Sequence, residues 1–416
     1  MIRLVQALRY RCLLDVRQEL GAFHVLVGPN ASGKSTFLDV PRLLGDLIKE
    51  GLKAVQDRSP DVRNLVFLGE GDRFEVAVEF EIPENRREKL ANGYRHARYE
   101  VALGHDSSGE LAIIAETLWL KPAEDASPVV RAQRQLFPEP RTPRSSIVLP
   151  EGRQAPHGWK KVVTKKGENS YFMSETTGWN NPFRLGPRKS ALANLPEDED
   201  RFPVATWVKR SLTEGVQKLA LNGEAMRRPA PPGSPRNFQP DGSNLPWAVE
   251  GLHRANQGLF EQWIGHVRTA LPDVTSVDTV ERPEDKFRYL RVTYRTGLIA
   301  PSWTVSDGTL RLLALTLVGY LDAPDQTWLV EEPENGIHPQ AVECVYQALS
   351  SAFGSQVLLA SHSPVLLSLP EPKDILCFAR TTEGATDVVR GDAHPRLVDW
   401  RRETDLGTLF ASGVLG

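Results

Sequence analysis

The segment at residues 28–36 constrains the chain most strongly, because the spacing of its residues nearly fixes its chemistry. It reads Gly-Pro-Asn-Ala-Ser-Gly-Lys-Ser-Thr and fits the Walker A pattern G-x-x-x-x-G-K-[ST], which binds phosphate. An apolar run at residues 25–27 precedes it, and apolar residues at roughly helical spacing follow from Phe37 to Ile48. The sequence therefore predicts a strand, a phosphate-binding loop and a helix, in that order.

The residue types in this loop predict how it would bind a nucleotide. Gly28 and Gly33 let successive backbone N–H groups point into one concave surface at the positive end of the helix. Lys34 is expected to reach the β- and γ-phosphates, Ser35 to offer its hydroxyl to Mg²⁺, and Thr36 to support the α-phosphate side. A chance match is the alternative, and the flanking strand and helix make it the weaker interpretation.

Length and composition limit the class of protein. A chain of 416 residues exceeds one ordinary core, so we expect two lobes or one domain with a large insertion. The formal net charge of -3 argues against a protein that coats nucleic acid with its whole surface. Cys12, Cys344 and Cys377 lie far apart, so neither a disulfide framework nor a zinc site is predicted. With no long apolar run and no signal-peptide pattern, we expect a cytoplasmic protein without membrane contact.

The first part of the chain predicts an antiparallel sheet. Apolar and acidic residues alternate between positions 73 and 82, which is typical of a strand with one exposed face. Residues 99–103 and 111–120 read as a hairpin closed by His-Asp-Ser-Ser-Gly.

The segment at residues 127–190 is basic and rich in proline. Its cations, together with interleaved aromatic residues, could track phosphates and stack on bases. An acidic protein partner, or a solvated insertion with no special role, are the alternatives. The cations are Arg131, Arg134, Arg141, Arg144, Arg153, Lys160, Lys161, Lys165, Lys166, Arg184, Arg188 and Lys189, and the aromatic residues are Phe137, Trp159, Tyr171, Phe172 and Trp179.

The middle of the chain reads as mainly helical. Residues 204–221 predict an amphipathic helix, a Pro/Gly-rich loop follows, and residues 247–271 are helical again. Strands return at residues 289–294.

The last quarter contains three further candidate pieces. Ser306 and Gly308 open a helix and predict a second anion-binding helix end, although taken alone an ordinary N-cap accounts for them. An apolar run at residues 328–330 leads into Glu331 and Glu332, as in a buried parallel strand whose tip faces a ligand. Glu331 is placed to hold Mg²⁺ through water and Glu332 to polarise the attacking water. The alternative is a solvated acidic turn.

A second buried strand, at residues 357–360, ends at Ser-His-Ser-Pro. A lone histidine is more often structural than catalytic. At the tip of a strand beside an acidic strand tip, however, His362 can hydrogen-bond a γ-phosphate or the attacking water.

In combination, these pieces resemble the ABC-type ATPase heads of the SMC/RecF/OLD-like group, over roughly residues 1–120 and 190–416. The strings that carry the resemblance are Gly28-Pro29-Asn30, Lys189-Ser190-Ala191-Leu192, Asp241-Gly242-Ser243-Asn244-Leu245, Ser306-Asp307-Gly308-Thr309-Leu310-Arg311, Glu332-Pro333-Glu334 with His338-Pro339, and Ser361-His362-Ser363-Pro364. The resemblance implies that Asn30, with Gly33, Lys34, Ser35 and Thr36, contacts ATP. It also implies that Ser306 and Gly308 form the ABC signature, which binds the γ-phosphate held by the opposite protomer of an ATP-sandwiched homodimer.

The sequence departs from the family pattern in several places. Glu331 stands where Asp is commoner, and the glutamine that usually senses Mg²⁺ has only Gln56 as a candidate. The long coiled-coil arms of the SMC branch are absent, and the basic segment stands in their place. The tail at residues 406–410 resembles that of short stand-alone members, several of which are ATPase subunits of antiviral defence systems such as Septu.

The resulting prediction is an α/β P-loop NTPase head of ABC type, with an antiparallel β-subdomain, a helical lobe and a β-rich insertion. We expect residues 1–120 to form the N-terminal part of the head, 121–200 the basic insertion, 201–288 the helical lobe and 289–416 the C-terminal part. The predicted function is an AAA-family ATPase that uses ATP and Mg²⁺ and gates a DNA-associated partner, for which a separately encoded nuclease is the expected candidate. A nucleotide-dependent scaffold with little turnover is the alternative. A small-molecule kinase is disfavoured, because it would leave Ser306 and His362 without roles.

Overall fold

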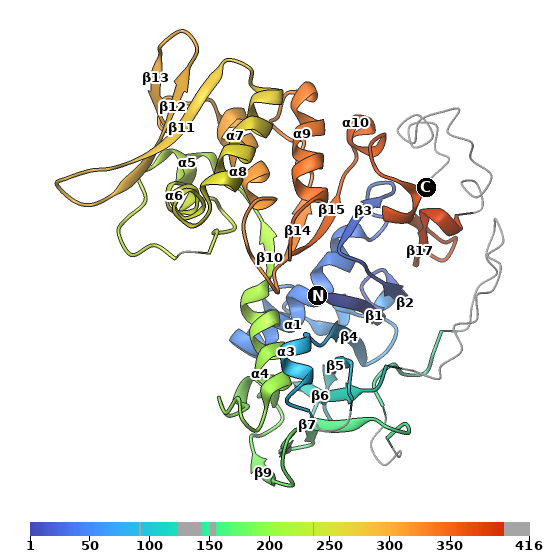
Figure 1. Ribbon diagram of the computed structural model, residues 1–416. Coiled ribbons are helices and arrows are strands. Elements are labelled where there is room, and N and C mark those ends of the chain that lie inside the picture. Colours follow the sequence, from blue (N-terminus) through green and yellow to red (C-terminus); the bar gives the residue numbers. More distant parts are fainter. Residues whose placement is uncertain (91–92, 124–142, 150–154, 236, 395–416) are drawn as a thin grey trace.

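The computed structural model describes residues 1–90, 93–123, 143–149, 155–235 and 237–394. The described chain is built around three sheets, of eight, six and three strands. Figure 1 shows the six-stranded sheet between the eight-stranded sheet and a helical lobe. The predicted fold class, a P-loop head with an antiparallel β-subdomain and a helical lobe, is confirmed.

The eight-stranded sheet is antiparallel throughout, in the order β2-β1-β4-β5-β6-β7-β8-β9. Strands from the basic segment continue the sheet that begins at the N-terminus, because β7 pairs directly with β6. The strands are β1 (Ile2–Tyr10), β2 (Leu13–Glu19), β4 (Arg73–Glu81), β5 (His96–His105), β6 (Leu111–Lys121), β7 (Lys160–Lys166), β8 (Asn169–Met173) and β9 (Asn180–Arg184).

The six-stranded sheet has the order β10-β14-β15-β3-β16-β17, and only β17 runs antiparallel to its neighbour. Its central strands are continuous apolar runs because both faces are covered. The carboxyl ends of β3, β14 and β15 therefore meet at one edge of the sheet. The strands are β3 (Phe23–Val27), β10 (Val216–Leu219), β14 (Thr327–Glu331), β15 (Gln356–Ala360), β16 (Ile375–Arg380) and β17 (Thr386–Arg390).

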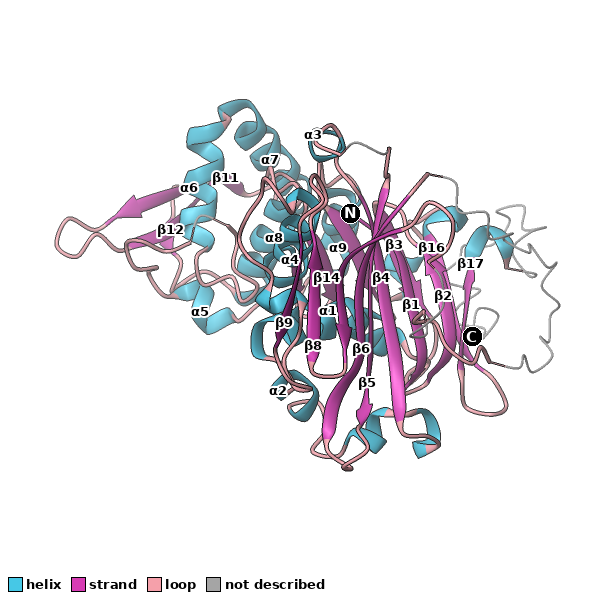
Figure 2. Ribbon diagram, turned by 90° about the horizontal axis from the view of Figure 1, so that it is seen from below, coloured by secondary structure: helices cyan, strands magenta, loops and turns pink. Residues whose placement is uncertain are grey.

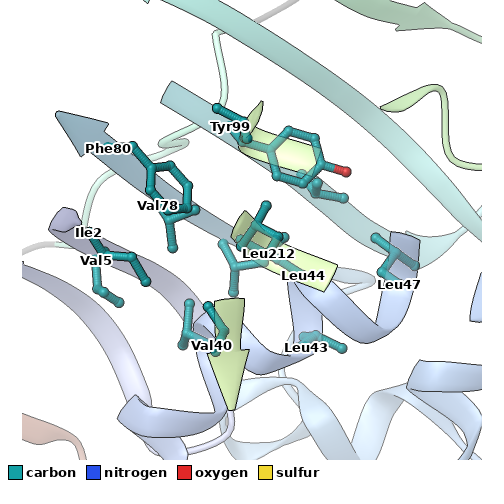
Figure 3. Close-up of a cluster of buried hydrophobic side chains, with 14 of the residues drawn as sticks. Ile2, Val5, Val40, Leu43, Leu44, Leu47, Val78, Phe80, Tyr99 and Leu212 are labelled. Carbon is teal, nitrogen blue, oxygen red and sulfur yellow. The ribbon is translucent and has the colours of Figure 1, made fainter. Parts of the chain in front are cut away.

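Helix α1 (Lys34–Glu50) lies between these two sheets. Its apolar residues share one core with strands of the eight-stranded sheet and with Leu26, Leu329 and Leu358 of the six-stranded sheet. Figure 3 shows this core, with Val40, Leu43, Leu44 and Leu47 of α1 facing Val5, Val78 and Tyr99. The packing is close enough that a Cβ on Gly45 would lie 2.2 Å from the carbonyl oxygen of Leu212.

The opposite face of the six-stranded sheet carries the second core, which includes Val25, Val330 and Leu359. Helices of the lobe cover it, and Figures 1 and 2 show β11 and β12 projecting away from the large sheets. The lobe and its neighbours comprise α5 (Gly223–Arg227), α6 (Leu245–Ala255), α7 (Gln257–Ala270), β11 (Val274–Glu281), β12 (Arg288–Tyr294), β13 (Ile299–Pro301), α8 (Asp307–Val318) and α9 (Pro339–Ser350). Short helices elsewhere are α2 (Lys53–Gln56), α3 (Glu84–Arg87), α4 (Pro203–Arg210) and α10 (Pro364–Leu367).

The single helix predicted over residues 204–221 is wrong in its second half. Helix α4 ends at Arg210, one wide turn spans Ser211–Gly215, and Val216–Leu219 forms β10. A short apolar run suits a strand as well as a helix. Here parallel pairing with β14 makes residues 216–219 a strand. The helix predicted over residues 247–271 is two helices, and Asn256 between them accepts a hydrogen bond from the N–H of Leu259 at 3.0 Å.

Candidate nucleotide-binding site

A cavity of about 480 Å³ opens where the carboxyl ends of β14 and β15 meet the loop after β3. Five predicted site residues line it together: Lys34, Ser35, Glu331, Glu332 and His362. Residues that sequence reasoning missed complete the wall, namely Lys218, Arg311 and Asn335 among others. The polar groups therefore converge from segments that are far apart in the sequence.

The loop between β3 and α1 has the geometry of a phosphate cradle. Gly28 and Gly33 have φ values of 153° and 104°. A Cβ would lie 2.2 Å from the carbonyl oxygen of Phe378 at Gly28, and 2.3 Å from Oγ1 of Thr386 at Gly33. Only glycine fits both positions. Gly33 is also the N-cap of α1 and supplies no capping side chain, so the first N–H groups of the helix suit an anion.

Lys34 is buried at the floor of the cavity. Its Nζ donates hydrogen bonds to the carbonyl oxygens of Gly28 at 2.6 Å and Pro29 at 2.8 Å. Burial lowers the pKa of Lys34 to about 8, although the nearby Glu332 and Glu331 oppose the shift. A desolvated ammonium group beside the cradle suits phosphate oxygens.

The donor set fits Mg²⁺ better than a transition metal. The described residues contain no group of three or more His, Cys, Asp or Glu that could hold a metal by itself. An exposed hydroxyl on Ser35 and the half-buried carboxylate of Glu331 are both oxygen donors in the cavity wall. Mg²⁺ commonly takes one or two such ligands and completes its shell with water and substrate phosphates. Glu331 also forms an ion pair with Lys218.

Glu332 adopts a left-handed backbone conformation with φ of 47°, which is uncommon for a residue other than glycine. Its N–H donates to the carbonyl oxygen of Ala360 at 2.8 Å, which ties the tip of β14 to β15. One carboxylate oxygen accepts a 2.5 Å hydrogen bond from Asn335, and the other lies 4.0 Å from Nε2 of His362. Burial and the charge of Lys34 lower the pKa of His362, which favours its neutral form.

Ser306 and Gly308 do not line this cavity. Ser306 is the exposed N-cap of α8, and its Oγ accepts a hydrogen bond from the N–H of Thr309 at 3.2 Å. A Cβ on Gly308 would lie 2.8 Å from the carbonyl oxygen of Gly336, so α8 packs against the loop after β14. The structure thus leaves the predicted signature residues, Ser306 and Gly308, outside the cavity of their own chain.

Asn30, Thr36 and Gln56 are the remaining predicted residues. Asn30 is exposed in the loop, and Oγ1 of Thr36 accepts a hydrogen bond from Sγ of Cys12 at 3.6 Å. Gln56 ends α2 and is not among the residues of the cavity wall. The end of β10 and the residues after it, 218–221, lie at the cavity instead. No sequence motif marked this segment.

Many described cations of the basic segment have partners within the chain. Lys165 is buried and its Nζ donates to the carbonyl oxygens of Gly186 at 2.7 Å and Lys189 at 2.6 Å. Further contacts are Lys160 with the carbonyl oxygen of Glu175, and ion pairs of Arg144 with Asp15, Arg184 with Glu168 and Arg188 with Glu110. Arg131, Arg134, Phe137, Arg141 and Arg153, like the tail at residues 406–410, lie outside the described residues.

Aromatic residues of the same segment also pack inward. Phe172 is buried in the main core, and Trp159 packs edge-on against Trp119 at 5.7 Å between ring centroids. Trp179 packs against Phe202 in the same way. These rings therefore stabilise the sheet, and contact with nucleic acid stays a prediction.

Together, the β3 loop, the strand tips and the sheet order define a P-loop NTPase head. The sequence matches the family described as "AAA domain, putative AbiEii toxin, Type IV TA system" over residues 23–368. This span exceeds half of the chain, so the protein belongs to that family of AAA-domain proteins.

Solved structures show the same fold. The chain is 15% identical to "SmcHead bound to the C-winged helix domain of ScpA", with a TM-score of 0.52 over 93% of this chain and 96% of that one. It is 14% identical to the Smc head domain with an extended coiled coil bound to the C-terminal domain of ScpA, derived from Pyrococcus furiosus, with a TM-score of 0.51 over 93% and 95% of the two chains. None of the curated proteins matches the sequence. Within the described part of the chain, no helix is long and apolar enough to span a bilayer.

Proposed function

We propose that the protein hydrolyses ATP and that two copies enclose two ATP molecules between them. The observation that carries this proposal is the convergence of Lys34, Ser35, Glu331, Glu332 and His362 on one cavity. These are the residue types that phosphoryl transfer to water requires: a phosphate-binding cation, oxygen ligands for a metal, and a base beside the attacking water.

In this proposal each residue takes one role. Lys34 and the uncapped start of α1 bind the phosphates of ATP. Ser35 and Glu331 would hold Mg²⁺, which when bound neutralises charge on the phosphates. Glu332 accepts a proton from the attacking water, and His362 hydrogen-bonds that water or the γ-phosphate.

The signature residues support a dimer. Ser306 and Gly308 stand at the exposed start of α8, outside the cavity of their own chain. A second copy placed head to tail would bring that helix start to the nucleotide on Lys34, and the same contact would recur in the other site by symmetry.

We also propose that the dimer controls a separately encoded effector that is associated with DNA. The simplest candidate for this effector is a nuclease that acts in antiviral defence. The resemblance to short stand-alone ATPase subunits and the toxin–antitoxin description of the family support this. The ScpA domain bound to the Smc heads shows that a head of this fold can carry a separate protein.

Mixing two inactive variants tests the sandwich. Lys34→Ala removes the phosphate-binding cation, and Ser306→Arg blocks the signature. In a mixed dimer one composite site combines the intact Lys34 of one chain with the intact Ser306 of the other. An equal mixture should therefore recover about a quarter of the wild-type turnover if dimers form at random. A site completed within one chain predicts no recovery.

The binding-class alternative is a scaffold that holds ATP with little turnover. Phosphate release by the wild type, measured with and without duplex DNA, separates the two. Saturable ATP binding with no phosphate release under either condition would favour the scaffold over the ATPase.

A further inference from the structure

Lys218 contacts the carboxylate that is expected to hold the metal. It lies on β10, and its Nζ forms an ion pair with Oε2 of Glu331 at the end of the neighbouring strand β14. In the parallel register Lys218 is opposite Leu329, two residues before Glu331. Leu329 belongs to the core on the α1 side of the sheet, and side chains two residues apart share a face. Lys218 and Glu331 therefore project on the same side as the phosphate-binding loop.

The two other cations that line the cavity, Lys34 and Arg311, have different environments. Lys34 donates to the carbonyl oxygens of its own loop. Arg311 lies near Asp307 and its Nη1 donates to the carbonyl oxygen of Leu221 at 3.5 Å. Among the described residues, only Lys218 forms an ion pair with Glu331.

The ion pair between Lys218 and Glu331 contributes little to holding β10 in the sheet. The side chains of Lys218 and Glu331 are 37% and 23% exposed, and partly exposed ion pairs stabilise a fold weakly. Val216 and Leu219 are buried and anchor the strand by themselves. The position of the pair in the wall of the nucleotide cavity points to a role in ligand binding.

We propose that Lys218 competes with the divalent cation for Glu331, so that metal–nucleotide binding releases Lys218 from this carboxylate. The inference rests on the proposed ATPase function. Two cations cannot share one carboxylate at close range without mutual repulsion. The ammonium group of Lys218 thus neutralises Glu331 before the metal arrives and must withdraw when it binds.

The segment that follows β10 leads from the cavity to the start of α8. Residues 219–221 continue along the cavity wall, and α5 begins at Gly223, where a Cβ would lie 1.8 Å from Oδ1 of Asp307. Asp307 is the first residue of α8 and follows Ser306. Gly223 therefore lies against the residue that opens α8.

The test is the Mg²⁺ dependence of nucleotide binding, measured by calorimetry with a non-hydrolysable ATP analogue. Lys218→Met should lower the Mg²⁺ concentration for half-maximal binding by about two- to fivefold, the size expected for a partly exposed ion pair. Lys218→Arg keeps the charge and should retain the wild-type value. Lys53→Met removes a lysine with exposed partners on α2 and controls for net charge.

A Glu331→Gln background makes the test specific, because adding Lys218→Met there should change the Mg²⁺ dependence no further. If the wild type binds the analogue but Lys218→Met needs the same or a higher Mg²⁺ concentration for half-maximal binding, the inference about Lys218 is wrong and the proposed function still stands. Failure of the wild type to bind the analogue at any Mg²⁺ concentration overturns the proposed function as well.

Discussion

The hydroxyl of Ser361 donates a 2.6 Å hydrogen bond to Oε1 of Glu334, and this contact joins the loops that follow β15 and β14. The same oxygen accepts a hydrogen bond from the N–H of Ser363 at 3.1 Å. His362 lies between these serines, so Glu334 fixes the backbone on both sides of the histidine. Glu334 is therefore a positioning residue for His362.

Glu334→Ala should lower ATP turnover by about 10- to 100-fold, because small displacements of a catalytic group have effects of that size. The affinity for ATP should change little, since Glu334 is not among the residues that line the cavity. Phosphate release and equilibrium ATP binding measure the two effects separately. Glu343→Ala, an exposed position on α9, is the matched control. An equal loss of affinity would show that Glu334 supports the binding site as a whole.

Glu332 is held between Asn335 and His362, as expected for a base aimed at one position. Glu332→Gln should reduce hydrolysis by at least about 100-fold while ATP still binds, so an ATP-bound dimer should accumulate. Light scattering with and without ATP measures the dimer. The double variant Lys34→Ala/Glu332→Gln should stay monomeric, because it lacks the phosphate-binding cation. Wild-type turnover in Glu332→Gln would reject the base assignment.

The parts of the site that the sequence predicted are those with local chemical signatures. Gly28, Gly33 and Lys34 have a fixed spacing, and Glu331 and His362 each follow a continuous apolar run. Because the carboxyl ends of parallel strands meet at one edge, such runs also predict which residues converge. This reasoning needs no knowledge of long-range pairing.

The parts that it missed depend on pairing between distant segments. Lys218 and Glu331 are 113 positions apart, and they meet only because Val216–Leu219 pairs with β14 instead of continuing α4. The differing composition of the basic segment predicts an insertion, and the structure shows that β7 extends the existing sheet. Its charges say little about the register in which strands pair.

The lowered pKa of Lys34 predicts a pH dependence of ATP binding. Burial brings this pKa to about 8, so the free protein loses the lysine charge as pH rises through that value. ATP binding then requires a proton to be taken up, and affinity should fall between pH 7.5 and 9.5. Binding of a non-hydrolysable analogue across this range measures the slope. Lys34→Met should bind more weakly and show a flatter profile, and parallel profiles would contradict the prediction.

The raised pKa of Glu175 predicts that its contribution to stability changes with pH in the direction opposite to that of a typical carboxylate. It accepts hydrogen bonds from the N–H groups of Val204 and Ala205, at 2.7 Å each, at the start of α4. Burial nevertheless raises its pKa from 4.5 to about 7. Between these values the folded protein keeps a proton that the unfolded chain has lost. The free energy of unfolding contributed by Glu175 therefore falls as pH rises through this window, and it is lowest above pH 7.

Glu175→Gln removes this titration, so the stability of the variant relative to the wild type should improve from pH 5 to pH 8. Thermal unfolding midpoints of both proteins at the two pH values measure the change. Glu168→Gln alters an exposed glutamate that pairs with Arg184 and should track the wild type at both. A constant difference between Glu175→Gln and the wild type would mean that the two N–H groups keep Glu175 ionised throughout, so that capping of α4 outweighs burial.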